Sequence, residues 1–352
     1  MKLKRKDIGE IYPNTVDVPH RKTMLCLNEG PINPMKMLWK EISEKLERLE
    51  VNRYHTRNTG LLLSKLSEYA GIGKDSIAMG NGADELLYFF FVMLRSKSKD
   101  KIVFPAPSYF DYNTYSKAVG MSQWPIDLDE NFIIDEKAMI EALQDDSSVA
   151  AIICNPNNPT GNLMPEAKII DIIKSTEKPV LIDEAYFEFS KYTMTKLIDK
   201  YENLFILRTF SKGFLSAGLR FGYIMANPDS IYQLRKVMTA FNLSLVIQTI
   251  ALVYLENIDW FRDKINELIR ERALLGKALS QIEDIEPFDS ATNFITFRID
   301  GEKESLFEHI KDNDIAIRDV SEHTLLEDCL RVTIGTSSEN QLFLEAINSY
   351  FE

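Results

Sequence analysis

The chain has 352 residues, of which 45% are hydrophobic and 27% are charged, proportions that are ordinary for a soluble globular enzyme with room for two domains. Its formal net charge is −12, from 53 acidic against 41 basic residues. This acidic balance argues against a dedicated nucleic-acid binder, which needs a basic face to neutralise phosphates, and equally against docking on an anionic membrane. Local basic pockets for small anions are compatible with it.

Cysteine and histidine usage indicates neither disulfides nor a metal site. Cys26, Cys154 and Cys329 are far apart and odd in number, and the four histidines show no metal-ligand spacing, so we expect a reducing, cytoplasmic location. The basic start MKLKRKDIGE has no apolar stretch behind it, so no secretory signal is expected. The longest apolar run, at 86–94, is too short for a bilayer and predicts a buried helix or strand.

Short apolar runs alternate with helix-periodic segments through the first two thirds of the chain. A strand-like IAM precedes GNGADEL at 80–86, and helical periodicity is clear in MPEAKIIDIIKS at 164–175. Further strand-like runs occur in KIVFPAP, SVAAIIC, KPVLIDEAYFEF, NLFILRTFSK and FGYIMANP. Strands separated by helices predict βαβ units and a mostly parallel sheet sandwiched by helices, an α/β fold. Ligands bind beyond the carboxyl ends of such strands.

The pattern changes after about residue 230. A long helical stretch over 233–280 is followed by the short strands NFITFRI and CLRVTIG and a final helix over 337–351. This predicts a second, smaller α/β domain at the C-terminus. We expect a large domain over 30–245 and a small domain that combines the N-terminal arm, 1–29, with 246–352.

The segment RTFSKGFLSAGLRFG at 208–222 places two cations among small residues. Lys212 follows a strand and could be a Schiff-base nucleophile, while Thr209, Ser211 and Arg220 offer donors suited to phosphate. The glycines of GNGADEL let backbone N–H groups at a helix start point at an anion. A phosphate beside a lysine suggests pyridoxal phosphate as strongly as it suggests a nucleotide. No Walker lysine or GxGxxG motif occurs at that loop, which argues against a nucleotide.

An acid at the end of the hydrophobic strand PVLIDEAY needs a partner in a low-dielectric pocket, and a protonated pyridine nitrogen would provide one for Asp183. Tyr186 and Asn158, in NPNNPTG, could bond the 3′ oxygen of such a ring, and Tyr109 could stack on its face. Each has a plainer alternative: Asp183 could cap the following turn, NPNNPTG could be only a proline-rich loop, and Tyr109 could be a core aromatic.

Taken together, GNGADEL, PSY, NPNNPTG, DEAY, RTFSKGFLSAGLRFG and CLRVTIGT occur in the order found in fold-type I aminotransferases, and the chain most resembles their histidinol-phosphate aminotransferase branch. The resemblance covers nearly the whole chain. It implies that Lys212 carries pyridoxal 5′-phosphate and shuttles the proton, with Asp183 and Tyr186 as its catalytic partners. The groups that would hold the cofactor are Ala83, Asp84, Tyr109, Asn158, Asp183, Tyr186, Thr209, Ser211, Lys212, Arg220 and Tyr54.

The resemblance also implies substrate contacts and a partner subunit. Tyr54, in NRYH, is similar to a tyrosine that reaches the cofactor phosphate of the neighbouring subunit, which would make the enzyme a homodimer. Arg331 matches an arginine that clamps the substrate carboxylate, and Arg318 one that contacts the substrate's phosphate. Asn28 and Glu29 lie in a strip, LNEGP, that closes over the substrate. The expected reaction transfers an amino group from L-glutamate to a phosphorylated carbonyl compound by ping-pong kinetics.

Three positions depart from the family pattern: Gly30 and Ile32 in the strip, and His55 where a proline is expected. We hypothesise that they alter the wall for the substrate side chain. The acceptor is then either imidazole-acetol phosphate, the histidinol phosphate precursor, or a compact keto-phosphate such as dihydroxyacetone phosphate.

Two other functions remain open from the sequence. A phosphoserine or phosphothreonine decarboxylase would use the same lysine, aspartate and arginines, because the outcome depends on which Cα bond lies perpendicular to the ring. A non-catalytic cofactor-binding protein is the second, although Lys212 is present and no appended DNA-binding domain is visible.

Overall fold

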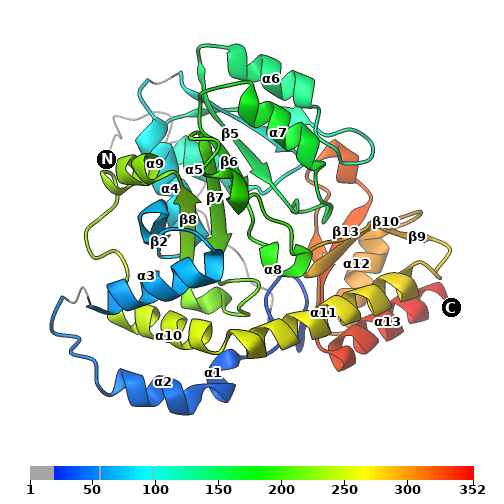
Figure 1. Ribbon diagram of the computed structural model, residues 1–352. Coiled ribbons are helices and arrows are strands. Elements are labelled where there is room, and N and C mark those ends of the chain that lie inside the picture. Colours follow the sequence, from blue (N-terminus) through cyan, green and yellow to red (C-terminus); the bar gives the residue numbers. More distant parts are fainter. Residues whose placement is uncertain (1–19, 55–56, 98) are drawn as a thin grey trace, which may run out of the picture.

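The computed structural model of the protein describes residues 20–54, 57–97 and 99–352. Its largest feature is a seven-stranded sheet with the order β2-β8-β7-β6-β5-β3-β4 (Figure 1). The strands are β2 (Ile77–Gly80), β3 (Lys101–Ala106), β4 (Ser122–Asp127), β5 (Ser148–Cys154), β6 (Val180–Asp183), β7 (Leu204–Thr209) and β8 (Gly222–Ala226). Only β8 runs antiparallel to its neighbours, so the predicted mostly parallel sheet is confirmed.

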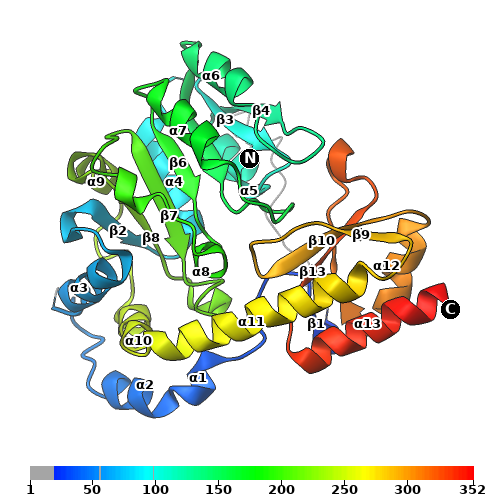
Figure 2. The same ribbon diagram turned by 45° about the vertical axis from the view of Figure 1, so that its right-hand side comes forward.

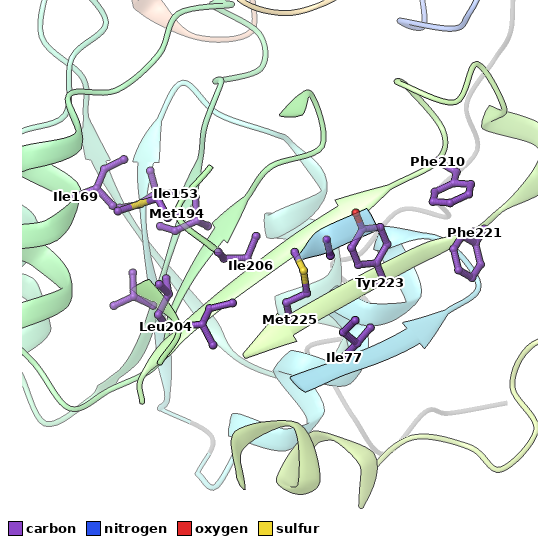
Figure 3. Close-up of a cluster of buried hydrophobic side chains, with 14 of the residues drawn as sticks. Ile77, Ile153, Ile169, Met194, Leu204, Ile206, Phe210, Phe221, Tyr223 and Met225 are labelled. Carbon is purple, nitrogen blue, oxygen red and sulfur yellow. The ribbon is translucent and has the colours of Figure 1, made fainter. Parts of the chain in front are cut away.

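Helices cover both faces of this sheet, because its central strands are apolar on both sides. On β5, for example, Ile153 faces one layer and Ile152 the other. The first layer consists of α2 (Trp39–Leu46), α3 (Arg57–Ala70), α6 (Glu136–Gln144), α7 (Glu166–Lys174) and α10 (Leu245–Glu256). The second consists of α4 (Ala83–Leu94), α5 (Asp111–Ala118) and α9 (Pro228–Arg235). Figure 3 shows the first layer's core, where Ile169 of α7 lies near Ile153.

The apolar run at 86–94, which the sequence left between helix and strand, forms most of α4. Gly82 precedes this helix with φ +91°, a left-handed conformation that glycine adopts without strain, and Asp84 and Glu85 stand in its first turn. Because α4 is packed between β8 and α5, nearly its whole circumference is apolar.

A smaller antiparallel sheet, ordered β12-β13-β10-β9, forms a second core (Figure 2). Its elements are β9 (Ile285–Pro287), β10 (Phe294–Ile299), β12 (Arg318–Asp319), β13 (Cys329–Thr333), α12 (Lys303–Asp312) and α13 (Ser337–Phe351). The 22-residue helix α11 (Ile258–Leu279) runs from the large sheet to the small one in both views. Phe261 near its start packs in the large core, and Leu275 near its end packs in the small core.

The N-terminal strip joins the small sheet's side of the molecule. β1 (Thr23–Met24) pairs in parallel with β11 (Ile315–Ala316), and Leu25 belongs to the small core. The remaining helices are α1 (Pro34–Met37) and α8 (Phe187–Ser190). No helix within the described ranges has the length and apolar character that a transmembrane span needs. The boundaries of the two domains, at residues 30 and 245, stay a prediction.

Candidate active site

A cavity of about 1050 Å³ lies where the carboxyl ends of β3, β5, β6 and β7 face β12, β13 and the N-terminal strip. Every site residue predicted from the sequence lines this cavity, with the exception of Tyr54. The lining residues among them are Asn28, Glu29, Ala83, Asp84, Tyr109, Asn158, Asp183, Tyr186, Thr209, Ser211, Lys212, Arg220, Arg318 and Arg331. Parallel strands deliver their following loops to one edge, which explains why residues from four separate motifs meet here.

Lys212 lies three residues beyond the end of β7, and its Nζ donates a hydrogen bond to the Leu27 carbonyl at 3.0 Å. Burial and, to a smaller extent, the nearby Arg331 guanidinium lower the pKa of Lys212 from 10.5 to about 8. A cation with a lowered pKa releases its proton near neutral pH. Lys212 can therefore supply the neutral, nucleophilic amine that Schiff-base chemistry requires.

Asp183 ends β6 in a fully buried position, where its carboxylate accepts hydrogen bonds from the Tyr112 hydroxyl at 2.7 Å and from the Ala185 N–H at 3.1 Å. Burial raises the pKa of Asp183 to about 6, although the Tyr112 hydrogen bond opposes the shift. A buried carboxyl group with no cationic partner among the described residues suits a ligand that brings its own positive charge. A protonated pyridine nitrogen is such a group.

The start of α4 and the loop around Arg220 form a narrow cradle. Arg220 has φ +54°, and its Nη2 lies 2.7 Å from the Asp84 carboxylate. A Cβ on Gly82 would lie 2.6 Å from the same Nη2, so only glycine leaves the space open. Ser211 accepts a bond from Arg220 Nη1 at 3.3 Å and another from the Thr209 hydroxyl at 2.9 Å. Hydroxyls, a guanidinium and a helix N-terminus together suit a phosphate group.

Two arginines of the small sheet face the cavity as direct cross-strand partners, Arg318 on β12 and Arg331 on β13. The buried Arg331 donates from Nη1 to the Asn158 side-chain oxygen at 2.5 Å and from Nη2 to the Cys26 carbonyl at 3.2 Å. Its Nε has no partner in the described part of the chain. Burial lowers the pKa of Arg331 to about 10, and Arg318 contributes to this shift. An orphaned donor on a buried cation suits a carboxylate ligand.

Aromatic side chains complete the walls. The Tyr109 hydroxyl donates to Asp84 at 3.2 Å, and the Tyr109 ring meets that of Tyr112 edge to face, with centroids 5.4 Å apart. Tyr186, which is 3% exposed, packs edge to face on Phe294 of β10. The Tyr186 ring, which lines the cavity, thus packs on a strand of the small sheet.

The positions at which the sequence departs from the family pattern lie elsewhere. A Cβ on Gly30 would lie 2.5 Å from Leu215 Cβ, so this glycine permits close packing of the strip on the loop that carries Lys212. Ile32 packs against the small core, and neither residue lines the cavity. His55 lies outside the described residues. Gly30 and Ile32 therefore give no reason to expect a reshaped substrate wall.

Tyr54 is 82% exposed and stacks on Phe241, with ring centroids 4.5 Å apart. It does not line the cavity of its own chain within the described residues. Such an exposed aromatic pair is free to contact another subunit.

Sequence reasoning missed several residues that line the cavity or support its walls. Tyr112, which holds Asp183, lies three residues after Tyr109 on α5, and this helical spacing was the available signal. Asp127, Glu322 and His323 line the outer part of the cavity without any motif to mark them. Asn157, within NPNNPTG, bonds the Ser108 hydroxyl and the Pro107 carbonyl and so braces the loop after β3.

The cavity meets the requirements of pyridoxal phosphate one by one. Lys212 can bind its aldehyde, Asp183 its ring nitrogen, and Tyr186 with Asn158 its ring oxygen. The cradle of Gly82, Ser211 and Arg220 suits its phosphate, since a side chain on Gly82 would fill that space.

Comparison with known proteins points to the same chemistry. The sequence model of the family described as aminotransferase class I and II matches residues 20–347. A histidinol-phosphate aminotransferase of Thermoanaerobacter pseudethanolicus is 33% identical over 330 residues, which cover 94% of this chain and 93% of the relative. One from Pyrococcus furiosus is 34% identical over 325 residues, with coverages of 92% and 91%.

Among solved structures, the chain is similar to the crystal structure of the histidinol-phosphate aminotransferase from Clostridium acetobutylicum. The TM-score is 0.85 at 28% sequence identity, and the match covers 93% of this chain and 98% of the other. The agreement extends over both sheets, since so little of either chain is left out.

Proposed function

The chain belongs to the class I and II aminotransferases, which act with pyridoxal 5′-phosphate, and from this premise we propose that it transfers the amino group of L-glutamate to a phosphorylated carbonyl compound. When bound, the cofactor supplies an electron sink for the bond broken at the substrate's α-carbon. Lys212 holds the cofactor and moves the proton at that carbon. Asp183 keeps a positive charge on the ring nitrogen.

The arginine pair of the small sheet is the observation that supports a substrate with two anionic groups. Arg318 and Arg331 face the cavity from adjacent strands, and neither forms an ion pair with an acid of the described chain. Two unpaired cations side by side repel each other until anions bind between them. We assign the α-carboxylate to the buried Arg331, whose Nε is free, and the substrate's phosphate to the exposed Arg318.

For the acceptor, we propose imidazole-acetol phosphate, the counterpart of histidinol phosphate. The cavity of about 1050 Å³ has room for a cofactor together with a substrate that carries a ring. Gly30 and Ile32, which suggested a compact acceptor, contact Leu215 and the small core instead. The similar proteins are named as histidinol-phosphate aminotransferases, which favours the same substrate.

We further propose that the enzyme is a homodimer in which Tyr54 reaches the partner's active site. Exposed apolar side chains gather on α1, α2, α3, α10 and the loops beside them, which lie together in Figures 1 and 2. They are Met37, Trp39, Val51, Tyr54, Leu61, Phe241 and Val246. A surface of this kind is typical of a subunit interface. A cytoplasmic location fits the three free, buried cysteines.

Half-reaction spectroscopy tests the proposal. Glutamate added to the cofactor-loaded protein should convert its visible spectrum to that of the amine form, and imidazole-acetol phosphate should restore it. Restoration by dihydroxyacetone phosphate with no response to imidazole-acetol phosphate would reassign the acceptor. No spectral change with glutamate, together with carbon dioxide release from phosphoserine or phosphothreonine, would show a decarboxylase instead. For the dimer, sedimentation should give twice the mass of one chain.

A further inference from the structure

Every residue of the segment Leu25–Asn28, which leads into and begins the N-terminal strip, is held by a backbone hydrogen bond. Each of its four successive carbonyl oxygens accepts a hydrogen bond from a different group. In chain order the donors are the Thr333 N–H at 2.8 Å, Arg331 Nη2 at 3.2 Å, Lys212 Nζ at 3.0 Å and Asn293 Nδ2 at 3.0 Å. Two of these donors belong to the substrate clamp and the nucleophile. The strip is therefore part of the site's framework and not only a cover over it.

Asn28 is the polar residue of this segment and is almost completely buried, with 2% exposure. Its φ of +55° lies in the left-handed region, which asparagine tolerates better than most residues. Its N–H donates to the Thr333 hydroxyl oxygen at 2.9 Å, and its Oδ1 accepts from the same hydroxyl at 3.2 Å. Its Nδ2 donates to the Tyr186 hydroxyl oxygen at 2.9 Å.

The Thr333 hydroxyl decides which end of the Asn28 amide faces Tyr186. This hydroxyl accepts the Asn28 backbone N–H, so its own proton is available for an acceptor. Only the carbonyl end of the amide can accept that proton. The Asn28 NH₂ group is thereby directed at Tyr186, and the alternative orientation would place two donors against each other.

The direction of this bond sets the role of Tyr186. A phenol has one proton to donate and two lone pairs, and Asn28 occupies a lone pair. The Tyr186 proton is left for an acceptor in the cavity that Tyr186 lines. Burial raises the pKa of Tyr186, so this proton is retained at neutral pH. Glu29, the next residue, is exposed and lines the cavity directly, which separates its role from that of Asn28.

We propose that Asn28 is a positioning residue that, held by Thr333, directs the Tyr186 hydroxyl as a hydrogen-bond donor toward the ring oxygen of the cofactor. The inference rests on the proposed function, because it needs that ring in the cavity. It changes the predicted role of Asn28 from a substrate contact to a group that acts through Tyr186. It also makes the hydrogen bonding of the ring oxygen depend on a hydroxyl of the small domain.

A donor at the ring oxygen has a measurable consequence. In the loaded protein, the cofactor's ring oxygen and the Lys212 nitrogen would share a proton. A hydrogen bond donated by the protein to the ring oxygen would make that oxygen a weaker acceptor of the shared proton. Loss of the donor should therefore raise the pH at which the visible spectrum of the loaded protein changes. For a hydrogen bond to a charged oxygen we expect a rise of roughly 1–2 pH units.

Asn28→Asp is the decisive variant, because aspartate tolerates the same backbone conformation and has nearly the same shape but only accepts hydrogen bonds. It should draw the Tyr186 proton away from the cavity and raise the spectral midpoint as much as Tyr186→Phe does. Thr333→Val removes only the hydroxyl that orients Asn28 and should give a smaller rise. If Asn28→Asp does not fold, Thr333→Val decides alone.

Asn340→Ala is the matched control. This asparagine is also buried in the small domain, but its amide bonds Glu271 and the Gly335 backbone. It should lower the melting temperature of the apoprotein and leave the spectral midpoint unchanged. The positioning role would be overturned if Tyr186→Phe shifts the spectral midpoint while Asn28→Asp and Thr333→Val keep the midpoint of the unmodified protein. A protein that forms no chromophore at all would instead contradict the proposed function.

Discussion

The inner end of the cavity and its mouth are constructed differently. The inner end, defined here as Asp183, Tyr186, Thr209 and Lys212, is delivered by adjacent strands of one sheet and is largely buried. The mouth, defined as Asp127, Arg318, Glu322 and His323, combines the edge strand β4 with the short strand β12 and the loop that follows it. Within the described residues, the ion-pair contact between these two parts joins His323 Nε2 and Asp127 Oδ1 at 3.5 Å.

This difference separates chemistry from recognition. Groups on neighbouring strands of a packed sheet cannot move independently, so the inner end keeps its geometry. Groups on an edge strand and a loop of another domain can change with little effect on the core. We therefore expect substitutions at the inner end to abolish turnover and those at the mouth to alter substrate choice.

Lys212→Ala should have the largest effect. It removes both the amine that binds the cofactor and the group that moves the substrate proton, so kcat should fall by at least about 10⁴-fold. The melting temperature of the apoprotein should not fall, because a desolvated cation is lost. Steady-state kinetics and thermal denaturation check both parts, and retained turnover would refute the assignment of the nucleophile.

Asp183→Asn should lower kcat by about 10²–10³-fold, because an amide cannot stabilise the charged ring nitrogen as a carboxylate does. The same substitution should improve the stability of the apoprotein near neutral pH. The pKa of Asp183 is raised from 3.8 to about 6 in the folded state, so the folded protein loses stability as pH rises from 4 to 6. The asparagine variant should lack this loss. Melting curves of both apoproteins across that range measure it, and parallel curves would contradict the shift.

Substitutions of the two arginines should affect KM for different substrates. Arg331→Lys keeps the charge but loses the planar donor pair, so KM for glutamate should rise by roughly 10–100-fold. Arg318→Ala should raise KM for the phosphorylated acceptor by roughly tenfold and leave that for glutamate nearly unchanged, because Arg318 lies at the exposed mouth. Equal effects of Arg318→Ala on both substrates would contradict the division.

The pH dependence of cofactor capture sharpens the description of the inner end. Only the neutral amine attacks an aldehyde, and the pKa of Lys212 is lowered to about 8. The capture rate should rise about tenfold per pH unit below pH 8 and then level off. Because the unfolded chain keeps this proton up to about pH 10.5, Lys212 should also add stability to the folded apoprotein as pH rises from 8 to 10.5. A capture rate independent of pH between 6 and 8 would be inconsistent with this amine.

His323→Ala should have the smallest effect. The Asp127 side chain is 80% exposed, and exposed pairs of this kind contribute at most about 1 kcal/mol. We expect a change in KM below about threefold and no change in kcat. A larger loss would mean that the mouth shares the rigidity of the inner end.

Much of the inner end could be predicted because its residues follow strands in recognisable motifs. Asp183 ends one apolar strand and Lys212 follows another by three residues, and parallel strands bring such positions together. The contacts that orient them could not be predicted in the same way. Tyr112 and Asp183 are 71 residues apart, and Asn28 and Tyr186 are 158 apart. No local pattern marks such pairs, because they arise when separate elements pack.

The sequence alone also assigned some residues to the wrong surroundings. Gly30 and Ile32 were expected at the substrate wall, yet the strip turns so that they contact Leu215 and the small core. The apolar run at 86–94 was compatible with a helix or a strand, and burial between two elements left no amphipathic pattern to distinguish them.

By itself, the sequence determined the α/β class, the order of the strands along the chain and the identity of the reactive groups, because hydrophobic periodicity and side-chain chemistry are local properties. Only the tertiary structure decided which donors hold each group, which residues form the mouth and how the strip links the nucleophile to the small domain. These depend on distances between segments far apart in the chain, and packing sets those distances.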